Sequence, residues 1–329
     1  MRDIRIGTIG TGFIVKNILT AISRTEGIGC EAVYSRSAEK GRALADAFGV
    51  GKVYTDLEQL LTDPAVDIVY IASPNSLHFE QARAALEHGK HVLCEKPFTS
   101  TVREADALIG LARERKLFLY EMVPTVFLPN YRLVQTHLPK IGRVRLVQCN
   151  YSQYSSRYDG LRVGEVANIF DLAYSGGCLQ DINYYNVHFT LSLFGKPAAV
   201  HYFPNRFANG IDTSGVVILH YADFVATLSG AKDTWGVNYA QIEGEDGFLY
   251  LANGANAIES VRVVTRTSDD TYTTQPDPDR WFYEIQGLVP LLRAGDHADC
   301  LGRLALTRSV VEVVESARKQ AGIVFPADR

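Results

Sequence analysis

Residues 4 to about 121 alternate between short apolar runs and helical patterns, and this alternation constrains the fold of the chain more than any other feature. Strand-like runs are expected at 4–9, 29–34, 53–54, 67–72, 91–94 and 118–121. Residues that commonly cap helices stand between them at Ser37, Thr55 and Thr101. Because a run such as 68–72 is apolar throughout, it predicts a parallel sheet that is buried on both faces. The fold class is therefore α/β, with a doubly wound, Rossmann-type N-terminal domain.

After Pro124 the pattern changes to extended runs that follow one another with little helix between the later ones. These runs lie at 144–151, 198–203, 216–221, 239–243, 248–251 and 261–265. They predict a large, mostly antiparallel, open sheet, interrupted by a helix at 179–194 and followed by a closing helix at 300–320. We therefore expect two domains: a doubly wound domain at 1–123 and a C-terminal α+β domain at 124–329.

The composition of the chain excludes several classes of protein. The 33 Lys and Arg against 37 Asp and Glu give a formal net charge of -4, without the basic excess that nucleic acid binding requires. No apolar run approaches the ~18–20 residues needed to cross a bilayer, and the chain starts on a strand-like run instead of a signal peptide. The five cysteines are scattered without a C-x-x-C pair, which is typical of a reduced compartment. We expect a cytoplasmic protein with neither nucleic acid nor membrane as a partner.

A glycine-containing loop, Gly10-Thr11-Gly12-Phe13-Ile14, follows the first strand and opens an apolar helical stripe. Gly10 permits a tight turn, and Gly12 lets the backbone approach a pyrophosphate that would rest on the first amides of the helix. Two glycines can also form a plain tight turn, and Val15 stands where the G-x-G-x-x-G/A pattern has its third small residue. The order of strand, loop and helix favours a dinucleotide site.

The end of the second strand indicates which dinucleotide is bound. An NAD-selective site usually carries Asp or Glu there for the ribose 2′-hydroxyl, but this chain has Ser35 and Arg36, followed by Lys40. A guanidinium can receive a 2′-phosphate through charge-assisted hydrogen bonds. The alternative is a solvated helix start with Ser37 as its cap, and both can be true. We expect NADP in preference to NAD.

Lys96 stands in the triplet Glu95-Lys96-Pro97 after the fifth strand, at the edge where open α/β sheets bind their ligands. The bond to Pro97 restricts Lys96 to an extended conformation. A desolvated lysine has a lowered pKa and can polarise a carbonyl or exchange a proton with an alcohol. The alternative is a surface lysine in a weak ion pair with Glu95.

A polar stripe is predicted on the helix at 179–194. Residues spaced i, i+3, i+4 and i+7 share one face, so Asp181, Tyr184, Tyr185 and His188 are suited to line a cleft. A nearby lysine cation favours the phenolate, so Tyr185 close to Lys96 could pass a proton to a substrate oxygen, with Asp181 orienting the pair. The alternative is a half-buried packing face.

Three motifs together resemble the Gfo/Idh/MocA family of NAD(P)-dependent oxidoreductases: the glycine loop, Ser73-Pro74-Asn75 with His78, and Glu95-Lys96-Pro97. In that family the lysine of the triplet is catalytic and its bond to proline is commonly cis, which the resemblance implies for Lys96. The second family signature, G-G-x-L-x-D-x-x-x-H, appears at 176–185 with Tyr185 in place of the histidine. Tyrosine at this place resembles the branch that contains dihydrodiol dehydrogenases and glucose–fructose oxidoreductase.

The resemblance also implies contacts outside the loop and the catalytic group. Further cofactor contacts are expected at the ends of the fourth and fifth strands, at Ser73, Asn75, His78 and Glu95, although Asn75 is equally suited to a plain helix cap. Substrate contacts are expected at Tyr184, Glu121 and His188, of which His188 falls where family members often place a polar substrate contact. No metal site is expected, because His88 and His91 lack a further ligand at suitable spacing.

The sequence thus predicts an oxidoreductase that interconverts a secondary alcohol and a ketone on a sugar-like, polyol or cyclic diol substrate. Hydride would pass to or from the nicotinamide, and Lys96 with Tyr185 would handle the proton. The alternatives are a redox-cycling glycosidase and a sensor or repressor that binds nicotinamide without chemistry. The open face of the C-terminal sheet predicts a homodimer or homotetramer. We expect residues 1–123 to bind the dinucleotide and residues 124–329 to bind the substrate and form the oligomer. The segment 152–175 matches no family pattern and is expected to help determine the substrate.

Overall fold

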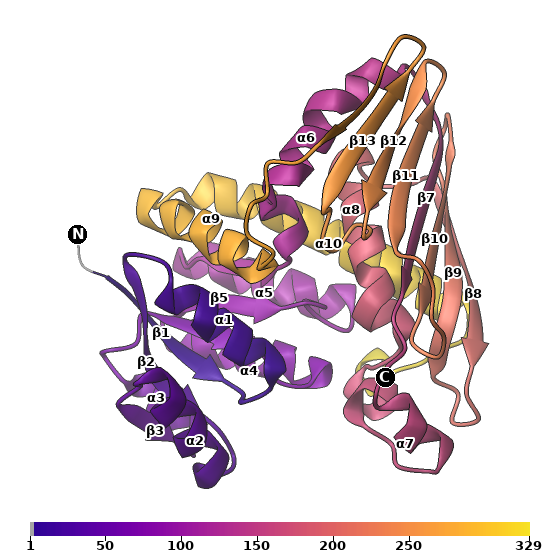
Figure 1. Cartoon of the computed structure of the whole chain (residues 1–329). Helices are drawn as coiled ribbons and strands as arrows, with labels where there is room; N and C mark the ends of the chain where they lie inside the picture. The colour runs from indigo at the N-terminus through magenta and orange to yellow at the C-terminus, as the bar shows by residue number, and fades with distance from the viewer. Residues whose placement is uncertain (1–2) are drawn as a thin grey trace. The chain divides into compact units, whose positions relative to one another are not determined.

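The computed structural model describes residues 3–329, which form two compact units (Figure 1). The first unit runs up to Met122 and also contains Trp281–Arg308, and the second contains Val123–Arg280 and Ser309–Arg329. The sequence analysis did not predict that residues 281–308 belong to the first unit. Their place there has a packing reason, since the His297 ring stacks on Phe118 at 4.3 Å and Cys300 donates to the Leu119 carbonyl.

The first unit is built on a parallel sheet of six strands in the order β3-β2-β1-β4-β5-β6. The strands are β1 (Ile4–Ile9), β2 (Ile28–Tyr34), β3 (Lys52–Tyr54), β4 (Ile68–Ile71), β5 (His91–Glu95) and β6 (Leu119–Met122). All six predicted strands are confirmed, with small shifts at their ends. The order is that of the doubly wound dinucleotide fold, in which β1 and β4 flank the point where the strand order reverses.

The helices that connect these strands begin largely where the sequence predicts. They are α1 (Phe13–Ser23), α2 (Ala38–Phe48), α3 (Leu57–Thr62), α4 (His78–Glu87) and α5 (Val102–Arg115), with α9 (Arg280–Ala294) added from the far end of the chain. Ser37 caps α2, and Thr101 with Glu104 forms the expected capping box at α5. The prediction for Thr55 is wrong, because the neighbouring Asp56 carboxylate accepts the amide of Glu58 and caps α3 instead.

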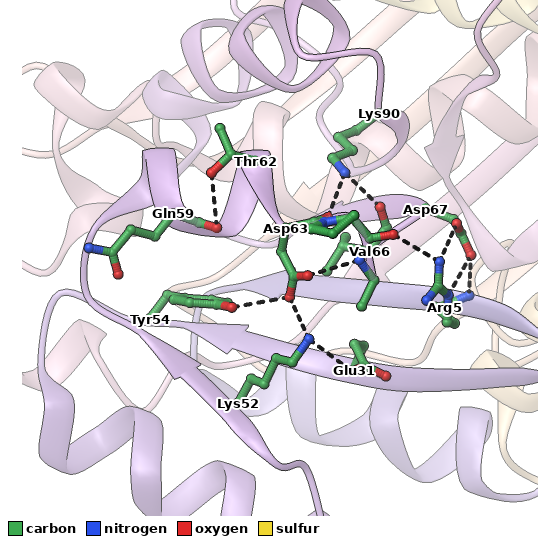
Figure 2. A network of polar contacts seen from close by, with 12 residues as sticks. Arg5, Glu31, Lys52, Tyr54, Gln59, Thr62, Asp63, Val66, Asp67 and Lys90 are labelled. Carbon is green, nitrogen blue, oxygen red and sulfur yellow. Dashed lines mark hydrogen bonds and ion pairs between the residues drawn. The ribbon is translucent and has the colours of Figure 1, made fainter.

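A network of polar contacts joins β3 to the segment between α3 and β4 and to Lys90, which precedes β5 (Figure 2). The Asp63 carboxylate accepts hydrogen bonds from Lys52 at 2.9 Å, from the Tyr54 hydroxyl at 3.1 Å and from the Ala65 amide at 2.8 Å. The buried Lys90 ammonium donates to the carbonyls of Asp63 and Val66. This network fixes the segment between α3 and β4, directly before β4 begins.

The second unit is built on an eight-stranded sheet in the order β14-β13-β12-β11-β7-β10-β9-β8. Its strands are β7 (Val144–Ser152), β8 (Ala199–Arg206), β9 (Asp212–His220), β10 (Val225–Ala231), β11 (Tyr239–Gly244), β12 (Gly247–Ala252), β13 (Ser260–Thr265) and β14 (Asp269–Tyr272). Only β10 and β7 pair in parallel, which confirms the mostly antiparallel sheet. The sequence analysis missed β10, which is rich in small residues, and β14, which is short, polar and exposed.

One buried helix packs on this sheet, and it carries the second family signature. A π-helical turn at Leu179–Asn183 leads into α8 (Tyr184–Phe194), whose Asn186 amide donates to the Ser229 carbonyl of β10. Residues 184–191 are all buried. The half-buried packing face, which was the alternative to a cleft-lining stripe, is therefore not seen at 184–191, and within α8 only Ser192, Leu193 and Phe194 are half-buried.

The other helices of the chain are α6 (Pro129–His137), α7 (Tyr158–Arg162) and α10 (His297–Gln320), and the division between the units falls within α10. No helix in the described part of the chain is long and apolar enough to cross a membrane.

Candidate active site

The glycine loop leaves the amino-terminal end of α1 open to an anion. Gly10 has φ +116°, and a Cβ there would lie 2.7 Å from the carbonyl oxygen of Ala72, so only glycine fits the turn. Gly12 is the N-cap of α1, has no side chain to cap the helix, and faces open space where its Cβ would be. The first turn of α1 contains no acidic residue. These features fit the pyrophosphate of a dinucleotide, which the helix amides would bind.

Two aromatic rings border the start of α1. Phe13 is 73% exposed at the first helical position, and its ring meets the edge of Trp281 at 5.9 Å. Thr11 and Ile14 are half-buried beside it. Trp281 belongs to α9, which the sequence analysis did not place near the loop.

At the end of β2, one residue caps the next helix, and other residues are those proposed to contact the phosphate. The hydroxyl of Ser37 accepts the Lys40 amide and thereby caps α2, while the Ser35 hydroxyl accepts the amide of Ser37. The side chains of Arg36 and Lys40 are exposed. Ser37 is therefore occupied as a cap, and the two cations remain at the surface beside this strand end.

Lys96 directly follows β5, and its preceding residue is anchored inside the unit. The Glu95 carboxylate is buried and accepts the Tyr70 hydroxyl at 2.7 Å, and burial raises the pKa of Tyr70 well above its usual value, so the phenol stays a donor. The Lys96–Pro97 bond is cis, as the family resemblance implies. Lys96 itself is half-buried at the carboxyl end of the sheet.

Some predicted cofactor and substrate residues of this unit have partners inside the protein. The ring nitrogens of the buried His78 lie 2.9 Å and 3.0 Å from the carbonyl oxygens of Pro97 and Ser73, and burial lowers the pKa of His78. His78 thus ties the end of β4 to the segment after β5. The Glu121 carboxylate accepts the Phe98 amide, which holds the same segment. Ser73 and Asn75 are half-buried at the end of β4, and all these contacts to ligands stay predictions.

In the second unit, the two glycines of the signature permit close packing around the start of the helix. Gly177 has φ +110°, and its Cβ would overlap the Asp212 carboxylate. That carboxylate accepts the Leu179 amide and the Tyr202 hydroxyl, both at 2.7 Å. Asp212 therefore fixes the first residue of the π-helical turn, and only glycine fits opposite it. Burial raises the pKa of Asp212.

Asp181 lies within that π-helical turn, a distortion that is frequent at functional sites. Its carboxylate forms an ion pair with the ammonium of Lys232, and the two side chains are 23% and 8% exposed. Lys232 directly follows β10. Sequence analysis missed it, although Ala226, Leu228 and Gly230 precede it at the alternation of a strand with one buried face.

Tyr185 is buried between an aromatic ring and a cation from distant parts of the unit. Its ring lies 6.0 Å from that of Tyr151 at the end of β7, and the Arg280 guanidinium lies 5.4 Å from its centroid. Arg280 also donates to the Asn256 carbonyl. The sequence analysis did not predict that Tyr151 and Arg280 contact Tyr185. Both residues are distant from Tyr185 in the sequence and lie near it only in the folded unit.

The remaining residues of the predicted stripe are enclosed. Tyr184 is fully buried, and burial lowers the pKa of His188 to about 4, so that its imidazole is neutral at physiological pH. The Nδ1 atom of His188 has no hydrogen-bond partner among residues 3–329. Contact of either residue with substrate stays a prediction, which their burial does not favour. Within the same described residues, no cluster of three or more His, Cys, Asp or Glu is arranged to hold a metal ion.

Comparison with protein families matches both halves of the chain. The model of the oxidoreductase family with an NAD-binding Rossmann fold, Gfo/Idh/MocA, matches residues 4–122. The model of the Gfo/Idh/MocA C-terminal domain matches residues 139–250.

Three similar proteins match over nearly their whole length. The oxidoreductase YgjR of Escherichia coli (strain K12) is 38% identical, covering 99% of this chain and 98% of its own. The NADP(+)-dependent scyllo-inositol 2-dehydrogenase IolU of Bacillus subtilis (strain 168) is 38% identical over 99% of both chains. Human trans-1,2-dihydrobenzene-1,2-diol dehydrogenase is 27% identical over 99% of both chains.

Solved structures share the fold of the whole chain. KijD10, a 3-ketoreductase from Actinomadura kijaniata in complex with NADP and TDP-benzene, superimposes with a TM-score of 0.85. The match covers 97% of this chain and 98% of that one at 23% sequence identity.

Proposed function

The chain belongs to the Gfo/Idh/MocA family of NAD(P)-dependent oxidoreductases, and on that premise we propose an NADP-dependent enzyme that interconverts a secondary alcohol and a ketone on a cyclic polyol or sugar-like substrate. The observation that carries the proposal is the open, uncapped amino-terminal end of α1 behind Gly10 and Gly12. In an enzyme of this family, such an end receives the pyrophosphate of the cofactor.

The preference for NADP is supported by the end of β2, where Arg36 and Lys40 are exposed and no carboxylate stands at the strand end. Their charges suit a 2′-phosphate, which NAD lacks. Two relatives, the inositol dehydrogenase and a D-xylose 1-dehydrogenase from Haloferax volcanii, are named as NADP(+) enzymes. We assign further cofactor contacts to Ser73, Asn75 and Glu95.

When bound, the nicotinamide would accept or supply the hydride, and residues of this chain would handle the proton. We assign Lys96 to the substrate oxygen, where its ammonium stabilises the alkoxide character that develops as the C–H bond breaks. In oxidation, the Tyr185 phenolate takes the hydroxyl proton, and in reduction the phenol returns it to the carbonyl oxygen. Asp181 orients these groups. The alcohol thus loses one hydride and one proton and becomes a ketone.

The proposed class of substrate is supported by two groups of polar residues in the second unit, one at Asp181 and one at Tyr185. Asp181, Lys232, Arg280 and the hydroxyl of Tyr151 supply both donors and acceptors within one unit. Such a set suits a molecule with several hydroxyl groups. The relatives that act on inositol and on cyclic dihydrodiols support a six-membered ring as the substrate.

A panel of substrates tests this function. Purified enzyme with NADP is offered scyllo-inositol, myo-inositol, trans-dihydrobenzenediol, xylose and glucose, and NADPH formation is followed by absorbance. We expect turnover of at least one cyclic polyol, with a higher kcat/KM for NADP than for NAD. Absence of turnover with the whole panel in both reaction directions would contradict the proposal.

We further propose that residues 1–123 bind the cofactor and that 124–329 bind the substrate and assemble the oligomer. The second role is supported by the strand β8, on which Phe203 is 58% exposed. A homodimer or homotetramer through this sheet would cover such a surface. Light scattering after gel filtration tests assembly, and a monomer at micromolar concentration would contradict it.

We place the enzyme in the cytoplasm. The proposal is supported by five free thiols, four of which are buried, since a reducing compartment keeps such cysteines unpaired. Cell fractionation with an antibody against the chain tests this location.

A further inference from the structure

Lys232 is an unusual residue for its position in the fold. It continues the strand β10, where Ala226, Leu228 and Gly230 face the helix side of the sheet, and the same alternation places Lys232 on that side. Its backbone is held on both sides, because its amide donates to the Thr213 carbonyl and its carbonyl accepts the Ser155 amide. A buried lysine on such a fixed backbone is costly unless an anion partners it.

Three carboxylates lie in this region, and the contacts distinguish them. Asp212 accepts the Leu179 amide and the Tyr202 hydroxyl. Asp233 accepts the hydroxyls of Thr213 and Ser214, at 2.6 Å and 3.0 Å. Neither of these contacts involves Lys232.

The contact of the Lys232 ammonium is with the third carboxylate, Asp181. The Phe170 ring lies 5.8 Å from the same ammonium and shields it from water. An ion pair shielded in this way is stronger and more directional than one on the surface. It fixes the rotamer of Asp181.

We infer that Lys232 is a positioning residue of the active site, which acts on the reaction by fixing the Asp181 carboxylate beside Tyr185. The inference rests on the proposed function, since it assigns a support to one of the proposed catalytic groups. Asp181 is otherwise carried by a π-helical turn, whose carbonyls and amides lack the regular α-helical pattern. The cation of Lys232, carried by the fixed backbone that follows β10, holds the Asp181 carboxylate in one orientation.

The test is a double-mutant cycle on turnover, with Lys232→Met, Asp181→Asn and the combination of both. Lys232→Met removes the charge while keeping much of the side-chain length, and we expect kcat to fall ~10–100-fold because a displaced catalytic group costs this much. The affinity for NADP should stay unchanged. Lys232→Arg, which keeps the charge, should retain kcat within roughly threefold, since it can still pair with Asp181.

The cycle separates positioning from structural damage. If Lys232 acts through Asp181, the double variant is no slower than Asp181→Asn alone, within about twofold. The matched control is Lys196→Met, which removes the lysine of an exposed ion pair with Glu312 in the same unit and should leave kcat unchanged. Circular dichroism and NADP binding establish that each variant is folded, and Lys232→Gln replaces Lys232→Met in the cycle if the latter is not.

Two results would overturn the inference. One is a Lys232→Met enzyme with the kcat of the wild type. The other is a loss that multiplies with that of Asp181→Asn, since Lys232 would then act independently of the carboxylate. Failure of the proposed function is a separate outcome, seen as a wild-type enzyme that turns over no polyol.

Discussion

At the scale of single residues, burial keeps many ionisable groups of this enzyme neutral and so limits which of them can exchange protons. Burial raises the pKa of the thiols, to about 12 for Cys149 and well above the ordinary value for Cys94 and Cys178. It lowers the pKa of His188 to about 4. The buried thiols are therefore protonated and poor nucleophiles near neutral pH, and the neutral imidazole of His188 is a weak base. The proposal that Lys96 and Tyr185 handle the proton does not depend on any of these groups.

The first prediction concerns the group that handles the proton. Tyr185→Phe removes only the hydroxyl, so we expect kcat to fall by ~10²–10⁴-fold, the usual contribution of a positioned acid or base, while NADP binding is retained. Steady-state kinetics measure kcat, and calorimetry measures the affinity for NADP. The matched control is Tyr221→Phe, which removes the hydroxyl of another buried tyrosine of the same unit, one that donates to the Gly195 carbonyl, and it should keep its turnover. Equal turnover of the Tyr185 variant and the wild type would remove Tyr185 from the mechanism.

The second prediction concerns the choice of cofactor. Arg36→Ala removes an exposed guanidinium beside the end of β2. We expect the Kd for NADP to rise roughly 10–100-fold, since a hydrogen bond to a charged group contributes about 1.5–3 kcal/mol, and the Kd for NAD to stay the same. Arg42→Ala, in the following helix α2, serves as a control. Parallel weakening of NADP and NAD would show that Arg36 does not bind the 2′-phosphate.

At the scale of elements, the start of the buried helix is the part most sensitive to added volume. Gly177→Ala would both strain a positive φ and push against the Asp212 carboxylate that fixes the Leu179 amide. We expect a loss of about 1–3 kcal/mol in stability from the backbone alone and a turnover reduced by at least ~10-fold, as the turn bearing Asp181 shifts.

The matched control for this prediction is Gly210→Ala. Gly210 also has a positive φ, of +86°, but its Cβ would meet only Leu172 at 3.7 Å. It should lose similar stability but keep its turnover. Thermal melts measure the stability of both variants, and steady-state kinetics measure their turnover. A Gly177→Ala enzyme as active as Gly210→Ala would show that the packing of Gly177 against Asp212 does not affect turnover.

The polar network around Asp63 predicts how the stability of the first unit depends on pH. Burial opposes ionisation of Asp63, but hydrogen bonds from Lys52, the Ala65 amide and Tyr54 hold its pKa below the ordinary value. Because the pKa is lower in the folded state, the ionised carboxylate contributes stability above its unfolded pKa, and this is lost as pH falls through the folded pKa.

Asp63→Asn should therefore lower the free energy of unfolding at pH 7 by about 1–3 kcal/mol, and with it the Tm. The difference in Tm between the variant and the wild type should shrink as the solution is acidified through the pKa of Asp63. Asp46→Asn, at an exposed position of α2, should change little. Melting curves from neutral to acid pH check both. A difference in Tm that does not depend on pH would show that the charge of Asp63 is unimportant.

The elements that sequence analysis predicted well are those with strong local signals. The parallel strands, the cap at Ser37 and the capping box at Thr101 depend on residues close together in the chain. Strand β10 was missed because Ser229 and Gly230 dilute its apolar alternation, and what makes it a strand is pairing with β7 and β9. The burial of residues 184–191 in α8 likewise depends on tertiary packing, such as the contact of Asn186 with β10.

The site was predicted unevenly for the same reason. Gly10, Lys96 and Asp181 stand in motifs of fixed spacing, so the sequence identified them as candidates. Lys232 and Arg280 have no such motif, and they join Asp181 and Tyr185 only through the folded sheet and the start of α9. Local patterns identify the candidate groups, whereas the residues that support them are found by tertiary contacts.

At the scale of the whole molecule, the chain is organised around two sheets whose units are not continuous in sequence. Residues 281–308 return to the first unit, and α10 runs from that unit into the second. Each proposed catalytic group is fixed within its own unit, with Lys96 after β5 and Tyr185 beside Arg280. The proposed reaction uses groups from both units, so it is tested on the whole chain.

The most direct test of the proposed reaction is the stoichiometry of the cofactor during turnover. Full-length enzyme is given excess NADP and a limiting amount of the best cyclic polyol, with ketone removed by a carbonyl reagent. We predict one NADPH formed for each polyol consumed, and loss of this signal in Lys96→Met. Product that accumulates with no net change in the cofactor would contradict a dehydrogenase and indicate a redox-cycling reaction.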